Sequence, residues 1–281
     1  MGFHELSHPL TVPFEPAWLE YHPAEPFLPL PPKTLPRDII QRIDLTTLHG
    51  DDHDARIQAL CAQARLPISD QPQIQVAAVC VFPEFVLNAH EFLSGSLVSI
   101  ATVAGGFPHG LSLLESRVFD VRSCAQLPCH EIDVVMRHSL ALGQNWPVLY
   151  DELIKIRLAA GSKKLKIILS SGELNRPEII YSASMVALMA GADFLKTSTG
   201  KEAVNATLEA GTVMVQAIRS FAEKSGRIAG IKAAGGIRQY LQADQWYQLV
   251  YQRLGAEAVH PSRFRIGASS LLDDLVLMKH I

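Results

Sequence analysis

The 281-residue sequence lacks the features that mark several large classes of protein. It contains no run of 18 apolar residues, which argues against a membrane-spanning helix. It begins Met1-Gly2-Phe3-His4-Glu5, without a basic start or an apolar core, so we predict no secretory signal. Its formal net charge is −3 and it has no dense cluster of lysine and arginine, which argues against nucleic acid as the main partner.

Cysteine and metal-ligand patterns are also sparse. The four cysteines are scattered and none forms a CxxC pair, which is typical of reduced thiols in a cytoplasmic protein. Cys124 and Cys129 have no second half-site at ligand spacing, and the eleven histidines include no HExxH motif. We therefore expect neither a metal nor another cofactor.

Proline, in contrast, is concentrated at the beginning of the chain. Nine of the 17 prolines fall within residues 1–36. Such a segment resists helix and sheet, so we expect it to wrap the surface or to be partly disordered. The sequence thus predicts a proline-rich extension over residues 1–36 and one α/β domain over residues 37–281.

The rest of the chain alternates between strand-like and helix-like patterns. Apolar, β-branched runs predict strands at 42–48, 75–83, 98–103, 131–136, 164–169, 192–197, 228–233 and 264–268. Stretches of helical period lie at 56–64, 113–125, 149–159, 177–190, 208–223 and 245–254. Eight strands alternating with helices over roughly 240 residues favour a (β/α)₈ TIM barrel over an open, doubly wound sheet.

Unusual polar residues interrupt five of the apolar runs. Lys196 and Lys232 each follow an apolar run, where burial and mutual repulsion would leave one of them as a free amine. A free amine is a nucleophile that can form a Schiff base with a carbonyl substrate. Asp44, Cys80 and Asp133 lie in three other runs. A buried ion pair could explain each charged residue alone, but their convergence at the C-terminal rim of a barrel favours a catalytic site.

The motifs, in order, resemble those of the deoxyribose-phosphate aldolase family. The resemblance extends from about residue 42 to residue 272. It rests on segments 44–48, 79–83, 101–103, 107–110, 131–135, 165–168, 172–174, 196–201, 204–207, 232–238 and 264–272. The lysine hexapeptide Lys196-Thr-Ser-Thr-Gly-Lys201 and the run Gly267-Ala-Ser-Ser270 are the most specific of these.

The resemblance implies a function for the charged residues. Lys196 would be the Schiff-base lysine, Lys232 the second lysine, and Asp133 the carboxylate that moves protons during dehydration and cleavage. The implied reaction splits 2-deoxy-D-ribose 5-phosphate into D-glyceraldehyde 3-phosphate and acetaldehyde, in the breakdown of deoxyribonucleosides. The small phosphorylated sugar is the expected partner, and a homodimer is left open because the sequence does not define the oligomeric state.

The substrate phosphate needs a site of its own. The pairs Gly235-Gly236 and Ser269-Ser270 follow the last two strands, where barrels of this kind bind phosphate, and Gly200-Lys201 could add a charge. Thr46 is the candidate for a substrate hydroxyl, although a β-branched strand residue needs no such role. We expect Asp44, Cys80 and Thr199 to line the pocket, Cys80 as an apolar filler.

Several loops depart from the family pattern, at residues 104–107, 127–130, 136–138 and 169–172, and the chain stops at Ile281. These departures leave the catalytic trio intact but bear on substrate range and turnover. Two other functions stay open: a related Schiff-base aldolase for another phosphorylated sugar, and a non-catalytic barrel that binds sugar phosphates.

Overall fold

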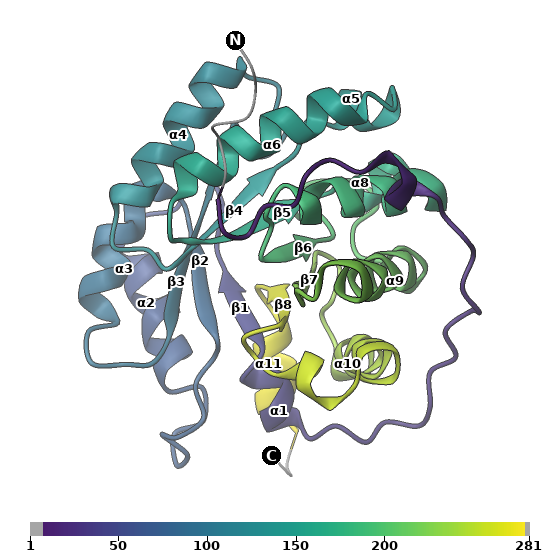
Figure 1. Ribbon diagram of the computed structural model, residues 1–281. Helices are drawn as coiled ribbons and strands as arrows, with labels where there is room; N and C mark the ends of the chain where they lie inside the picture. The colour runs from purple at the N-terminus through teal and green to yellow at the C-terminus, as the bar shows by residue number, and fades with distance from the viewer. Residues whose placement is uncertain (1–7, 279–281) are drawn as a thin grey trace.

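The computed structural model describes residues 8–278, in which eight parallel strands form a closed barrel (Figure 1). The strands are β1 (Ile43–Thr46), β2 (Ala78–Val81), β3 (Ser99–Ala104), β4 (Glu131–Val135), β5 (Lys164–Ile168), β6 (Phe194–Lys196), β7 (Gly230–Ala234) and β8 (Phe264–Ala268). Each pairs with its neighbour in sequence, and β1 closes the barrel against β8. The prediction of a TIM barrel is confirmed, and all eight strands lie within or one residue beyond their predicted ranges.

Helices surround the barrel on its outer face (Figure 1). They are α1 (Pro36–Ile40), α2 (Asp54–Arg65), α3 (Val86–Phe92), α4 (Leu114–Gln126), α5 (His138–Leu142), α6 (Trp146–Ala160), α7 (Ser171–Leu174), α8 (Pro177–Met189), α9 (Leu208–Ser225), α10 (Tyr240–Leu254) and α11 (Leu271–Val276), with 3₁₀ turns η1 (Pro16–Leu19), η2 (Pro83–Phe85) and η3 (Ala256–Val259). The six predicted helices are present. Helix α10 begins five residues before its predicted start because Gln239 and Gln242 form a capping box. Within residues 8–278, no helix is both long and apolar enough to cross a membrane.

The barrel interior is divided between an apolar side and a charged side. Strand residues alternate between the two faces of a sheet, so every second side chain points inward. On β2 and β3 the buried cluster is apolar and contains Cys80, Ala101 and Val103. On β4 the carboxylates of Glu131 and Asp133 ion-pair with lysines from β5, β6 and β7, whereas the alternate residues join the core under the helices.

Residues 8–35 lie along the outside of the barrel (Figure 1). The backbone of Val12 accepts a hydrogen bond from the Tyr150 hydroxyl of α6, and its N–H donates to the carbonyl of Met189 at the end of α8. Farther along, Leu30 exchanges two hydrogen bonds with the side-chain amide of Gln248 on α10. The segment therefore connects α6 and α8 with α10, which occupy different positions around the outside of the barrel.

The division into an extension of residues 1–36 and a barrel of residues 37–281 stays a prediction. Helix α1 begins at Pro36, the last residue of the predicted extension. Residues 1–7, which include the start used to predict the absence of a secretory signal, and residues 279–281 lie outside the described residues.

We expect the outer segment to contribute to stability through Trp18. Its ring packs edge-on against Phe221 of α9, with 6.1 Å between ring centroids, and lies 5.8 Å from the Lys224 ammonium. Trp18→Ala should lower the free energy of unfolding by about 2 kcal/mol, less than for a fully buried tryptophan. Leu28 lies in the same segment but is 76% exposed. Leu28→Ala is the matched control and should change stability by less than about 0.5 kcal/mol in urea denaturation. Equal effects of the two substitutions would contradict this assignment.

Candidate active site

The site is centred on the carboxylate of Asp133, which three lysines contact inside the barrel. Oδ1 accepts from Nζ of Lys166 at 2.8 Å, and Oδ2 accepts from Nζ of Lys196 and of Lys232, also at 2.8 Å. The four residues come from β4, β5, β6 and β7 and are almost completely buried. Lys196 and Lys232 are direct neighbours in the register of β6 and β7.

A second layer of charge lies beneath Asp133. Lys232 also contacts Asp44 of β1 at 2.6 Å, and Lys166 contacts Glu131 at 2.5 Å. The Arg265 guanidinium of β8 joins these two carboxylates, at 2.6 Å from Asp44 and 2.9 Å from Glu131. Each buried charge therefore has partners of opposite sign, which buried charges require.

Lys196 and Lys232, which share Oδ2 of Asp133, differ in the direction of their pKa shifts. Burial lowers the pKa of Lys196, and the charge of Lys232 lowers it further, against the attraction of Asp133. Burial opposes the charge of Lys232 as well, but Asp133 and Asp44 outweigh it and raise its pKa. Burial would also raise the pKa of Asp133, yet the three ammonium groups around it hold that pKa well below its usual value. Of this pair, Lys196 is thus the lysine that loses its proton more readily.

A cavity of about 190 Å³ opens above Lys196 at the C-terminal ends of the strands. Ten of the residues named from the sequence line it: Thr46, Lys196, Thr199, Gly200, Lys201, Lys232, Gly235, Gly236, Ser269 and Ser270. Asp133 lies below the cavity, in contact with both lysines. Asp44 and Cys80 do not line the cavity, contrary to expectation. The first is fixed by Lys232 and Arg265, and the second packs in the apolar half of the interior.

The loops after β7 and β8 meet at one end of this cavity. Gly235 and Gly236 have φ values of 84° and 81°, in the left-handed region that favours glycine. A Cβ at Gly235 would also lie only 2.5 Å from the Asn205 side chain. Ser269 and Ser270 are exposed and precede α11. This end of the cavity therefore presents backbone and hydroxyl groups rather than apolar side chains.

The loop after β6 contains a carboxylate that sequence reasoning missed. Glu202 accepts hydrogen bonds from the backbone N–H groups of Thr199, Gly200 and Lys201, at 2.9–3.1 Å. It also accepts from the Ser170 hydroxyl of the loop after β5 at 2.6 Å. Burial opposes its charge, but these donors hold its pKa below the usual value. The backbone N–H groups of Gly200 and Lys201 are thus engaged, and this loop contributes charge to the cavity through the Lys201 side chain.

Sequence reasoning also missed the roles of Glu131, Lys166 and Arg265. All three were visible in the predicted strands, and Glu131 lies two positions before Asp133, on the same inward face. A charged residue within an apolar run at this spacing was the available signal. Among residues 8–278, no group of three or more histidine, cysteine, aspartate or glutamate side chains is placed to hold a metal.

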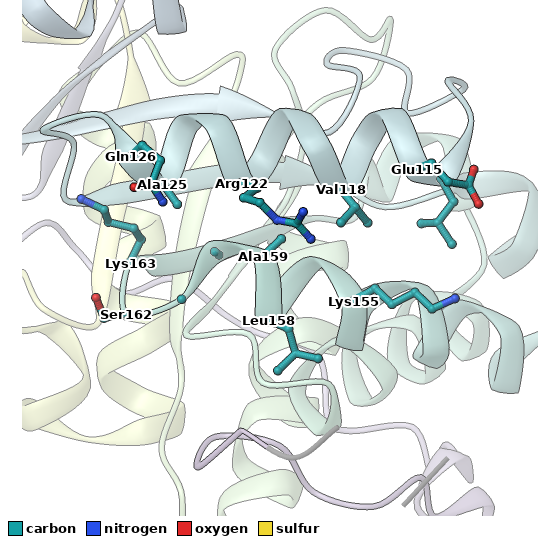
Figure 2. Close-up of a pocket in the computed structure, with 13 residues that line it drawn as sticks. Glu115, Val118, Arg122, Ala125, Gln126, Lys155, Leu158, Ala159, Ser162 and Lys163 are labelled. Carbon is teal, nitrogen blue, oxygen red and sulfur yellow. The ribbon is translucent and has the colours of Figure 1, made fainter. Parts of the chain in front are cut away.

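A larger cavity of about 740 Å³ lies elsewhere, in a groove between α4 and α6 (Figure 2). Val118, Leu158 and Ala159 contribute apolar surface, and Glu115 and Lys155 lie toward one end. These residues belong to the outer helices. The volume of a cavity is therefore a poor guide to the site in this protein, because Lys196 and Lys232 line the smaller cavity.

A buried lysine at the C-terminal end of a TIM-barrel strand lies where barrel enzymes have their active sites, and a lysine amine can form a Schiff base with a carbonyl compound. The family model of DeoC/LacD family aldolases matches residues 38–275, and the chain belongs to this family. It is 46% identical to human deoxyribose-phosphate aldolase over 244 residues, which cover 83% of this chain and 77% of the human protein. It is 44% identical over 240 residues to a putative deoxyribose-phosphate aldolase of Caenorhabditis elegans, covering 85% and 79% of the two chains. The crystal structure of a putative deoxyribose-phosphate aldolase from Coccidioides immitis superimposes with a TM-score of 0.72 at 25% identity, covering 96% of this chain and 91% of that one.

The assignment of the nucleophile can be tested by trapping. Acetaldehyde with borohydride should leave a reduced adduct on Lys196, because a neutral amine attacks the aldehyde and the iminium is then reduced. Peptide mass spectrometry identifies the modified residue. Lys196→Ala should abolish the adduct, whereas Lys155→Ala, at an exposed lysine of α6, should not. An adduct on Lys232 would reverse the two roles.

Proposed function

We propose that this protein is a deoxyribose-phosphate aldolase, which cleaves 2-deoxy-D-ribose 5-phosphate to D-glyceraldehyde 3-phosphate and acetaldehyde. The observation that carries the proposal is the pair of adjacent lysines on one carboxylate, with Lys196 buried and its pKa lowered. Curated relatives that bear this name match most of the chain at 44–46% identity. Release of acetaldehyde from the phosphorylated sugar is the direct test. A related aldolase would leave this sugar intact and cleave another sugar phosphate into that sugar's own two fragments, and a binding protein would cleave neither.

The proposed chemistry begins at Nζ of Lys196. The neutral amine attacks the C1 aldehyde of the open-chain sugar, and loss of water gives an iminium. The iminium accepts the electron pair of the C2–C3 bond once the C3 hydroxyl loses its proton, and D-glyceraldehyde 3-phosphate leaves. The resulting enamine takes a proton at C2, and water hydrolyses the iminium to acetaldehyde and the free amine.

Asp133 and Lys232 have different roles in this scheme. Asp133 is 2.8 Å from the reacting amine and could move protons through a water during dehydration and cleavage. Lys232 remains protonated, because Asp133 and Asp44 hold its charge, and it repels a proton on Lys196. Thr46 faces the cavity as the candidate for a substrate hydroxyl.

The phosphate is proposed to bind where the loops after β7 and β8 meet. Gly235 and Gly236 allow close approach of the backbone, and Ser269 and Ser270 add hydroxyl and N–H donors. Lys201 would contribute through its ammonium, since Glu202 engages its backbone N–H. The four cysteines are free and buried, which suits a reducing cytoplasmic location. A homodimer is part of the same hypothesis.

The phosphate site can be tested with substituted serines. Ser269→Glu combined with Ser270→Glu should raise KM for 2-deoxyribose 5-phosphate at least tenfold, because like charges would face each other. The matched substrate is 2-deoxyribose, whose KM should change little. Equal changes for the two sugars would locate the phosphate elsewhere.

A separate expectation concerns metals. In the proposed scheme, the iminium is the electron sink, and charge stabilisation requires no Lewis acid. Extensive dialysis against EDTA should therefore leave kcat within about twofold of its starting value. Loss of activity that a divalent ion restores would assign the protein to a metal-dependent mechanism.

A further inference from the structure

Six buried charges besides Lys196 form a closed ring inside the barrel. Three cations and three carboxylates alternate around it, in the order Lys166, Glu131, Arg265, Asp44, Lys232, Asp133 and back to Lys166. The six joining contacts measure 2.5, 2.9, 2.6, 2.6, 2.8 and 2.8 Å in that order. Every carboxylate bridges at least two cations and every cation at least two carboxylates, since Lys166 also lies 3.6 Å from Asp44 across the ring. The ring as a whole carries no net charge.

Lys196 lies outside this ring and contacts it at one point. Its ion pair is with Oδ2 of Asp133, an oxygen that also accepts from Lys232. A proton on Lys196 would therefore add an uncompensated positive charge to a neutral, buried assembly. Such a charge is costly where water cannot solvate it.

We propose that the charge balance of the whole ring keeps Lys196 a neutral amine, and that Glu131 and Arg265 are positioning residues that set this balance from the layer beneath Asp133. Neither residue lines the cavity above Lys196, and neither contacts Lys196. Glu131 acts through Lys166, and Arg265 acts through Asp44. The proposal rests on the function of Lys196 as the Schiff-base lysine.

Other titratable groups that lie next to these residues do not change the charge balance of the ring. Cys80 of β2 is fully buried, and burial raises the pKa of its thiol, so it is uncharged. Lys164 lies 3.4 Å from Glu131, but its side chain is 33% exposed and its charge is partly solvated.

The proposal predicts that removing the charge of Glu131 and removing the charge of Arg265 shift the pKa of Lys196 in opposite directions. Glu131→Gln removes a negative charge, so a proton on Lys196 becomes less favourable and the pKa of Lys196 falls. Arg265→Gln removes a positive charge and has the opposite effect. A single charge at roughly 10 Å, across an effective dielectric constant of about 20, corresponds to a shift of about one pH unit. The double substitution removes one charge of each sign and should return the pKa close to its starting value.

The measurement is the pH dependence of the rate at which acetaldehyde and borohydride label Lys196. Labelling requires the free amine, so its rate declines as pH falls through the Lys196 pKa. Glu131→Gln should move this decline about one unit lower, Arg265→Gln about one unit higher, and the double variant should restore it. Glu115→Gln, at an exposed position of α4, is the matched control and should leave the decline unchanged.

Two results would overturn the proposal in distinguishable ways. If Lys196 is labelled but the pH at which the labelling rate declines is the same in Glu131→Gln as in the unsubstituted protein, the charge-balance proposal is refuted. The proposed aldolase function is not affected by that result. Absence of any Lys196 label in the unsubstituted protein would refute the function and the inference together. Thermal unfolding of each variant identifies those that fold. If Arg265→Gln does not fold, the near-isosteric Glu131→Gln decides the question by the sign of its shift.

Discussion

Attraction between buried charges of opposite sign is the interaction on which this barrel and its site both depend. Removing one partner of a buried ion pair typically costs about 3–5 kcal/mol, because the other charge stays buried and unpaired. In the ring each residue has at least two partners, which come from β1, β4, β5, β7 and β8. The same set of contacts therefore holds these strands in register, helps to close the barrel and forms the surroundings of Lys196.

The uneven interior explains how one barrel holds both a core and a reactive amine. The side formed by β2 and β3 is filled by Cys80, Ala101 and Val103, and it resembles the interior of an ordinary parallel barrel. The opposite side is filled by paired charges. Lys196 ends β6 at the boundary between the charged interior and the cavity, where a substrate carbonyl can reach it.

The sequence predicted the barrel well because each strand is a short apolar run and each long helix has a clear period. Lys196, Lys232 and Asp133 were conspicuous as charges within apolar surroundings. Glu131, Lys166 and Arg265 were not singled out, because their partners lie on other strands, far away in the sequence, and no local pattern pairs them. Helices α5, α7 and α11 contain only four to six residues, too few for a periodic signal. Glu202 acquires its role only when the Gly200 turn directs three N–H groups toward it.

The outer segment has a consequence for the order in which the molecule can form. Its residues leave the ribosome before those of the barrel, yet Val12 binds the carbonyl of Met189 and Leu30 binds Gln248. The segment must therefore wait, without its native contacts, until most of the barrel has been synthesised. Its docking is then a late step of folding, because its partners lie at the end of α8 and on α10. The segment can dock only after this second half of the barrel has formed.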